Sequence, residues 1–148
     1  MPALAPELIE RFRAQGWLVA PGGVTAPALA RLGAELAQWV EASRAHDASY
    51  GETMDGVARF DLEAGHTRDR PRLRRVNNPA EISEAWREAS FAGATADMVA
   101  DLIGPDVKFI HSKINLKLPA TDTRVGFHQD FAYVPLTNED MVTALLML

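Results

Sequence analysis

Over the first hundred residues, apolar side chains recur every three or four positions in blocks separated by Gly and Pro, which predicts helices that each bury one face. The first block, residues 6–15, begins at Pro6 and is followed by Gly16, as expected for a short helix. Residues 17–20 form a short apolar run that predicts a strand, closed by a Pro-Gly-Gly turn. Thr25 is a suitable N-cap for a second helix. The apolar face of that helix consists of Leu29, Leu32, Leu36, Trp39 and Val40.

Two further helices are predicted beyond residue 77. Asn78 caps a helix whose first residue is Pro79 and whose apolar face carries Ile82 and Trp86, four positions apart. The last helix of this region begins at about Thr95 and is ended by a Gly-Pro pair. The helical region therefore extends over about 6–104.

Residues 44–77 show no apolar period and are interrupted by several glycines. An irregular stretch of this length indicates a functional loop or a disordered segment. The segment also holds the basic cluster of the chain, which consists of Arg68, Arg70, Arg72, Arg74 and Arg75. Two interpretations of this cluster remain open, a solvated charged face or an anion-binding site for an acidic substrate.

From about residue 107 the apolar period changes from 3.6 to 2, which predicts strands. In the first of these, residues 107–118, one face is apolar and the other carries His111, Lys113, Asn115 and Lys117. Residues 125–131 and 141–148 are the second and third strand candidates, and the third is almost wholly apolar. We expect a single domain over residues 1–148.

Composition narrows the function classes. The 148 residues are 47% hydrophobic and 24% charged, enough to bury one core. The net charge of −5 argues against a general nucleic-acid or membrane-surface partner, and no apolar run approaches the ~20 residues needed to span a bilayer. The absence of cysteine excludes disulfides, zinc–thiolate sites, iron–sulfur clusters and thiol nucleophiles. The N-terminus lacks the pattern of a signal peptide, so we expect a cytoplasmic protein.

His128 and Asp130 are the candidate metal ligands. On a strand, residues i and i+2 point to the same side with Cα atoms roughly 6.6–7 Å apart, so both side chains reach one ion. A His and an Asp placed in this way supply two ligands of the 2-His-1-carboxylate triad that binds non-haem Fe(II). An exposed hydrogen-bonded pair explains the same spacing, so the spacing alone leaves both interpretations open.

A wider pattern surrounds this pair. The sequence His-Gln-Asp-Phe-Ala-Tyr at 128–133 follows the polar-faced strand that ends at 115–119, and the chain opens with Phe-Arg-Ala-Gln-Gly-Trp-Leu-Val at 12–19. Together with the helix-to-strand passage at 101–107, this resembles the N-terminal portion of the phytanoyl-CoA dioxygenase (PhyH-like) family of Fe(II)/2-oxoglutarate oxygenases. The resemblance is most specific over 110–135. It implies an α+β fold, in which N-terminal helices pack on a double-stranded β-helix (jelly-roll, cupin-like) core.

The resemblance also implies an activity and residue roles. The family couples decarboxylation of 2-oxoglutarate to succinate with hydroxylation of a small organic substrate, using Fe(II) and O₂. His128 and Asp130 match the first two iron ligands, and the retained Asp130 favours a hydroxylase over a halogenating relative. Lys113 falls on a position that contacts 2-oxoglutarate in relatives; a solvated strand residue is the alternative. His111 is either a lining residue of the site or a hydrogen-bonded structural histidine.

The sequence departs from the family pattern after Asp130, because no His, Lys or Arg follows it. The family needs a distal His as third ligand and a cation for the far carboxylate of 2-oxoglutarate. We therefore expect a chain truncated before the second half of the jelly roll, inactive alone, and prone to self-association through its C-terminal strands. The alternatives are a non-catalytic interaction module and a cupin-like protein that binds another divalent metal through His128, Asp130 and His111.

Overall fold

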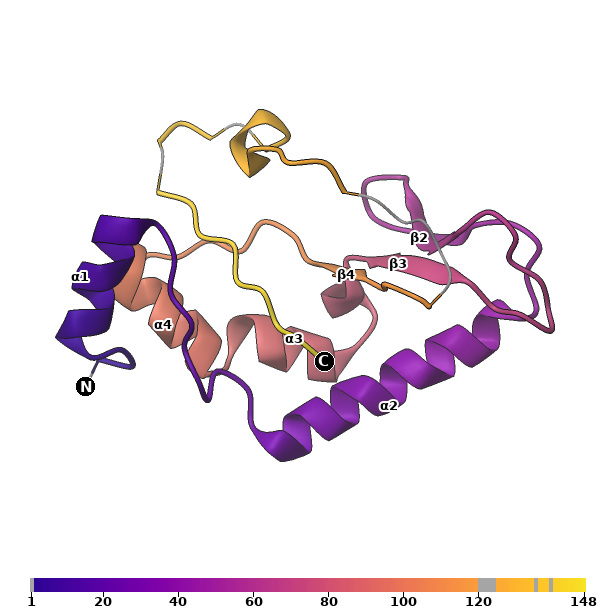
Figure 1. Ribbon diagram of the computed structural model, residues 1–148, viewed down its shortest axis with the longest axis horizontal. Helices are drawn as coiled ribbons and strands as arrows, with labels where there is room; N and C mark the ends of the chain where they lie inside the picture. Colours follow the sequence, from indigo (N-terminus) through magenta and orange to yellow (C-terminus); the bar gives the residue numbers. More distant parts are fainter. Residues whose placement is uncertain (1, 120–124, 135, 139) are drawn as a thin grey trace.

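The computed structural model describes residues 2–119, 125–134, 136–138 and 140–148. The elements in chain order are α1 (Pro6–Gln15), α2 (Ala26–Ser43), β1 (Tyr50–Glu52), β2 (Ala58–Leu62), β3 (Leu73–Asn77), the 3-10 turn η1 (Pro79–Glu81), α3 (Glu84–Phe91), α4 (Ala94–Ile103), β4 (Lys113–Asn115) and the 3-10 turn η2 (Asp130–Ala132). The helices and the sheet form two layers, and η2 lies on the far side of the sheet from α2 and α3, whereas the last residues run back to the level of the helices (Figure 1).

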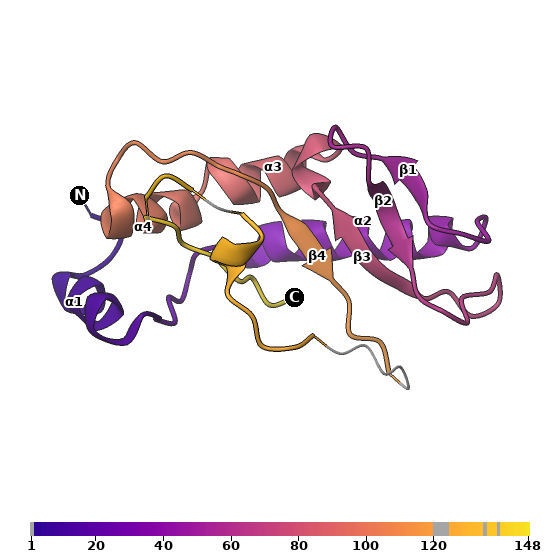
Figure 2. The same ribbon diagram turned by 90° about the horizontal axis from the view of Figure 1, so that it is seen from above.

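The four strands form one antiparallel sheet in the order β1-β2-β3-β4. Its register aligns Phe60 with Val76 and Val76 with Ile114, so one sheet face carries a continuous apolar row across three strands. The helices α2 and α3 cover this apolar face, and Figure 2 shows α2 running behind the strands. The opposite face carries no helix among the elements named above.

The core lies between the apolar sheet face and the helices. Trp39 of α2 packs against the rings of Trp86 and Phe60, with centroid distances of 6.1 and 6.0 Å. The buried members of this cluster are Leu32, Leu73, Val76, Ala85, Trp86 and Ile114. Burying one such large aliphatic side chain contributes about 1.5–3 kcal/mol, so these contacts hold α2 and α3 to the sheet.

Three predicted helices are confirmed. The helix α1 ends at Gly16, which adopts the left-handed conformation (φ 78°) that closes a helix without a steric penalty. The N-cap of α2 is Thr25, whose hydroxyl accepts a hydrogen bond from the Ala28 amide at 3.4 Å. The helix α4 begins one residue before Thr95 and ends before Gly104, as the Gly-Pro pair predicts.

The expectation of an irregular segment over residues 44–77 is wrong, because β1, β2 and β3 all lie within it. These strands are short, and the pairing of β2 with β3 shifts register between Asp61 and Leu62. Such a bulge interrupts the alternation of apolar and polar positions from which strands are predicted. The sheet therefore extends into the region expected to be helical or irregular.

One local prediction near the helices is met only in part, and another is wrong. Asn78 occupies the N-cap position of η1, which begins at Pro79 as predicted, but this 3-10 turn ends at Glu81 and the Asn78 side chain forms no capping hydrogen bond. Asn78 adopts a left-handed conformation (φ 47°), and its backbone amide donates to the Ser112 carbonyl beside β4 at 2.8 Å. The helix α3 starts later, at a Ser83 N-cap whose hydroxyl accepts from the Trp86 amide at 3.2 Å. Residues 17–20 do not form a strand, since no neighbouring strand pairs with them in the described part of the chain.

The C-terminal strand predictions are only partly met. Within 107–118 the strand is β4 alone, because its partner β3 ends at Asn77 and the chain turns away at Asn78. Residues 125–129 and 141–148 are not paired in a sheet. The jelly-roll core stays a prediction, and so does self-association through residues 141–148. Of these, Leu145 and Met147 are each 86% exposed.

The helices of the described residues are too short or too polar to cross a bilayer.

Arg59 joins the sheet to η1 through a buried guanidinium, 6% exposed. Nη1 donates to the carbonyl oxygens of Asn77 and Asn78 at 3.0 and 2.8 Å, and Nη2 donates to the Glu52 carbonyl at 3.0 Å. Nη2 also forms an ion pair with Glu81. One side chain thus fixes the ends of β1 and β3 and the turn that leads into α3.

We predict that Arg59→Met destabilises the fold by about 3–5 kcal/mol, since it leaves the Glu81 carboxylate unpaired in a partly buried position. Urea denaturation followed by circular dichroism measures the change. The control is Arg31→Met, which breaks an exposed ion pair with Glu88 (side chains 51% and 57% exposed) and should cost less than about 1 kcal/mol. Equal effects of the two substitutions would contradict the role of Arg59.

Candidate metal centre

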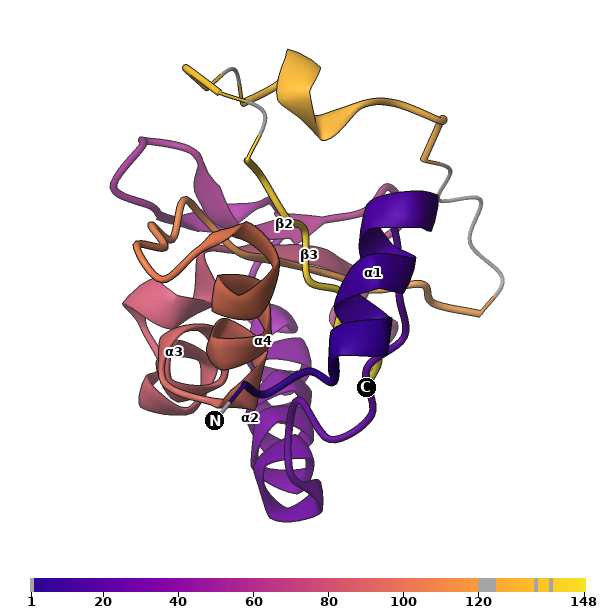
Figure 3. The same cartoon turned by 90° about the vertical axis from the view of Figure 1, so that its left-hand side faces the viewer.

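The segment containing His128 and Asp130 lies on the side of the sheet that the helices leave uncovered. Figures 1 and 3 both place η2, which begins at Asp130, across the sheet from α2 and α3. Ile114 of β4 is buried in the core, so its strand neighbours Lys113 and Asn115 face the other way, toward the side of η2. The two parts of the predicted site therefore share one side of the sheet.

His128 and Asp130 converge at their polar ends. The distance between His128 Nε2 and Asp130 Oδ1 is 3.2 Å, and the two side chains are 35% and 44% exposed. Nδ1 of His128 lies 2.8 Å from the Gly126 carbonyl oxygen. A carbonyl oxygen only accepts, so Nδ1 carries the proton and donates it to Gly126.

This tautomer determines what the pair binds. With the proton on Nδ1, Nε2 presents a lone pair toward a carboxylate oxygen, and two acceptors at this separation need a cation between them. Either a second proton or a metal ion meets that need. Histidine ligands commonly donate their other ring N–H to a backbone carbonyl, as His128 does here, because this contact fixes the ring and its tautomer.

The separation of the two donor atoms fits a metal ion. With bonds of about 2.1 Å from a divalent ion to imidazole nitrogen and carboxylate oxygen, donors 3.2 Å apart subtend an angle of roughly 100°. That angle suits adjacent positions of an octahedral or tetrahedral ion. The half-exposed side chains leave access for further ligands, so the residues present fit two positions of a metal centre.

Thr143 orients the carboxylate from the C-terminal segment. Its hydroxyl donates to Asp130 Oδ2 at 2.9 Å, which leaves Oδ1 directed at His128. The Tyr133 ring packs edge-on against the imidazole with a centroid distance of 5.5 Å. Both ligands are thus supported by neighbours that restrict their rotation.

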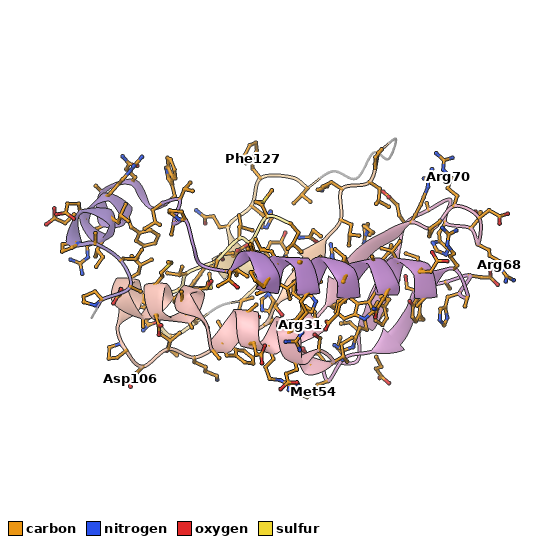
Figure 4. All side chains as sticks on the ribbon, turned by 90° about the horizontal axis from the view of Figure 1, so that it is seen from below. Arg31, Met54, Arg68, Arg70, Asp106 and Phe127 are labelled. Atoms are coloured by element: carbon orange, nitrogen blue, oxygen red, sulfur yellow. The ribbon has the colours of Figure 1, made fainter. Side chains whose placement is uncertain are left out.

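The expectation of a strand over 125–131 is wrong, but His128 and Asp130 still lie on the same side of the chain, as the strand would have placed them. Gln129 is extended (φ −104°, ψ 125°), and one extended residue is enough to place its two neighbours on the same side. The chain then enters η2, so no sheet is needed to bring the ligands together. Phe127, which precedes His128 in the sequence, points into solvent and is fully exposed (Figure 4).

No group of three potential ligands is present among residues 2–119, 125–134, 136–138 and 140–148. The expectation that His111 joins His128 and Asp130 in a cupin-like metal site is therefore not met in this part of the chain. His111 lies in the exposed segment before β4. Lys113 lies on β4, opposite Asn77 of β3, and its side chain is exposed. Its contact with 2-oxoglutarate stays a prediction.

The structure separates the arginines of the basic cluster. Arg74 pairs with Asp61, and Arg72 donates to the Ala64 carbonyl at 3.0 Å. Arg68 and Arg70 project from the loop between β2 and β3 at the outer end of the molecule (Figure 4). Arg75 donates from Nε to Asn115 Oδ1 at 3.3 Å, on the helix-free face. The cluster is thus not one surface.

Two supporting residues were missed by sequence reasoning. Gly126 acts through its carbonyl, which any residue type provides, so the sequence contains no signal for it. Thr143 is the one hydroxyl in the apolar run of 141–148, but its partner Asp130 is 13 residues away, so the sequence does not indicate the contact.

The chain is similar to a "Probable alpha-ketoglutarate-dependent hypophosphite dioxygenase" from Stutzerimonas stutzeri, with 35% identity over 71 residues. These residues make up 48% of this chain and 24% of that protein, so the chain spans about a quarter of the length of this relative. No protein-family model and no solved structure matches the chain.

We predict that Thr143→Val weakens binding of a divalent ion by roughly ten- to hundred-fold, since it removes the donor that holds the Asp130 carboxylate. Calorimetric titration with Co(II) measures the affinity. The matched control is Thr137→Val, an exposed threonine in the same segment, which should bind Co(II) as the parent does. Identical affinities for the two variants would exclude Thr143 from the centre.

Proposed function

We propose that this chain belongs to an Fe(II)/2-oxoglutarate-dependent dioxygenase of the PhyH-like type, a hydroxylase of a small substrate, with His128 and Asp130 as two of its iron ligands. The observation that carries the proposal is the convergence of Nε2 and Oδ1 at 3.2 Å while Nδ1 is held by the Gly126 carbonyl. The similarity to an alpha-ketoglutarate-dependent dioxygenase supports the same chemistry.

The residues of the chain have distinct tasks in this proposal. Bound Fe(II) supplies the redox chemistry that couples O₂ and 2-oxoglutarate to oxidation of the substrate. His128 contributes a neutral donor whose tautomer is fixed, and Asp130 contributes one negative charge. Thr143 keeps the second carboxylate oxygen engaged, which leaves Oδ1 for the metal. The third ligand of the triad is not assigned to any described residue.

Lys113 is the proposed contact for a carboxylate of 2-oxoglutarate. It faces the helix-free side of the sheet because Ile114, its neighbour on β4, is buried in the core. In this proposal, the sheet with its helical cover forms the support of a jelly-roll core. The helix-free face then lines the cavity in which co-substrate and substrate meet.

The sequence favours an organic substrate through its family resemblance, whereas the relative from Stutzerimonas stutzeri is described as a hypophosphite dioxygenase. Hypophosphite is a small oxyanion with P–H bonds, and its oxidation to phosphite is chemically a hydroxylation at phosphorus. It is therefore the first compound to test as a substrate, followed by small organic acids.

We predict that His128→Ala abolishes succinate formation in the whole protein, because the remaining ligands cannot fix the open coordination positions. The same change should remove Fe(II) binding by the 148-residue chain, measured anaerobically. His111→Ala tests the cupin-like alternative and should leave both properties unchanged. Near-normal succinate production by His128→Ala would remove this residue from the site.

We further predict that Lys113→Ala raises the apparent KM for 2-oxoglutarate roughly ten- to hundred-fold, because it removes a charge-assisted hydrogen bond. Fe(II) affinity should stay the same, since Lys113 does not ligate the metal. Lys108→Ala, an exposed lysine in the preceding segment, is the control. An unchanged KM in Lys113→Ala would make this lysine a solvated strand residue.

A further inference from the structure

Two cations lie close together on the helix-free face of the sheet, Arg75 on β3 and Lys113 on β4. Arg75 is paired in register with Asn115, and Lys113 with Asn77. Arg75 and Lys113 are therefore diagonal neighbours on antiparallel strands, roughly 7–8 Å apart between backbone positions. Both face away from the core, because the adjacent residues Val76 and Ile114 are buried in it.

The guanidinium of Arg75 is oriented but not neutralised. Its Nε donates to Asn115 Oδ1 at 3.3 Å, which fixes the plane of the group and leaves the two terminal nitrogens as donors. Among the described residues no carboxylate pairs with it. A planar fork of free N–H donors is suited to bidentate binding of a carboxylate or another oxyanion.

Arg75 differs in this respect from the other arginines near the sheet. Arg59 is paired with Glu81, and Arg74 with Asp61. Protein carboxylates thus neutralise the arginines that hold the fold together. Asp61 lies directly opposite Arg75 in the register of β2 and β3, but its two carboxylate oxygens accept from Arg74 and Ser49. Arg75 itself has an amide partner, which orients it without cancelling its charge. Its neighbour Lys113 adds a second positive charge, so the Asp61–Arg74 pair leaves these two cations on the face available to an anion.

We propose that Arg75 binds an anionic group of the primary substrate, beside the 2-oxoglutarate at Lys113, and that the substrates of this protein are therefore small anions. The assignment of this anion as a substrate rests on the proposed function. The anion site itself depends only on the placement of Arg75 and Lys113 on the sheet. The anionic group that Arg75 would bind is a carboxylate or a phosphorus oxyanion. Either group has two oxygens that can accept hydrogen bonds from one guanidinium. Arg75 is thus a specificity-determining residue.

The test uses the 148-residue chain and two probes, hypophosphite and 2-oxoglutarate, each titrated separately by NMR or calorimetry. Arg75→Gln should weaken hypophosphite binding roughly ten- to hundred-fold and change 2-oxoglutarate binding much less. Arg75→Lys keeps the charge without the fork and should restore part of the affinity. Arg70→Gln is the control, because Arg70 belongs to the same cluster but projects from the outer loop (Figure 4).

Three outcomes would overturn the proposal. They are no measurable hypophosphite binding by the parent chain, equal loss in Arg75→Gln and Arg70→Gln, or a loss for 2-oxoglutarate as large as that for hypophosphite, which would make Arg75 part of the co-substrate site. Thermal melting of each variant shows whether the sheet is intact, and Arg75→Lys keeps the test valid if Arg75→Gln unfolds.

The inference and the proposed function fail separately. If the whole protein forms succinate but Arg75→Gln binds hypophosphite normally, the dioxygenase stands and the anion site is refuted. If Arg75 determines anion binding while Fe(II) does not bind to His128 and Asp130, the anion site stands and the dioxygenase is refuted.

Discussion

The buried guanidinium of Arg59 is the contact on which the arrangement of sheet and helices depends. It satisfies three carbonyl oxygens where the strands end, on Glu52, Asn77 and Asn78, and a charge this buried requires the Glu81 carboxylate beside it. The chain turns at Asn78, whose amide bonds to Ser112 and so sets where β4 joins the sheet. The turn into α3 and the last strand are therefore positioned from one point. The placement of Lys113 depends on that strand.

Local pattern was enough to predict α1, α2 and α4, because the residues that end or cap each helix and those of its apolar face lie close together in the sequence. The strands between residues 44 and 77 were missed because their stability comes from contacts that are distant in sequence. His66 is an example: its Nδ1 accepts from the Arg72 amide at 2.8 Å, so its Nε2 donates to the Ser43 carbonyl at 3.2 Å. It ties the loop between β2 and β3 to the end of α2. No period in the sequence signals such a contact.

In the candidate site, too, the features set by neighbouring residues were predicted from the sequence, and those set by distant contacts were not. The spacing of His128 and Asp130 predicted that their side chains meet, and they do, although an extended Gln129 and a 3-10 turn bring them together instead of a strand. The period-2 pattern around Ile114 correctly placed Lys113 on the polar side of β4. Thr143 could not be assigned a role from sequence, because its contact with Asp130 joins segments 13 residues apart. The strand pattern of 141–148 gave no reason to single it out.

Under the proposed function, the positive charges on the helix-free face can be compared with the negative charges of the molecules that would bind there. A divalent ion bound by one carboxylate and one neutral imidazole retains a positive charge, and Arg75 and Lys113 each add another. A dianionic co-substrate such as 2-oxoglutarate compensates most of this charge but not all of it. A monoanionic substrate would neutralise the positive charge that remains, whereas a cationic substrate would be repelled by it. Such interactions are stronger in a partly desolvated site than in water. Under the proposed function, Arg75 and Lys113, which form no ion pair with a carboxylate among the described residues, are the positive charges that bound anions would compensate in a chain of net charge −5.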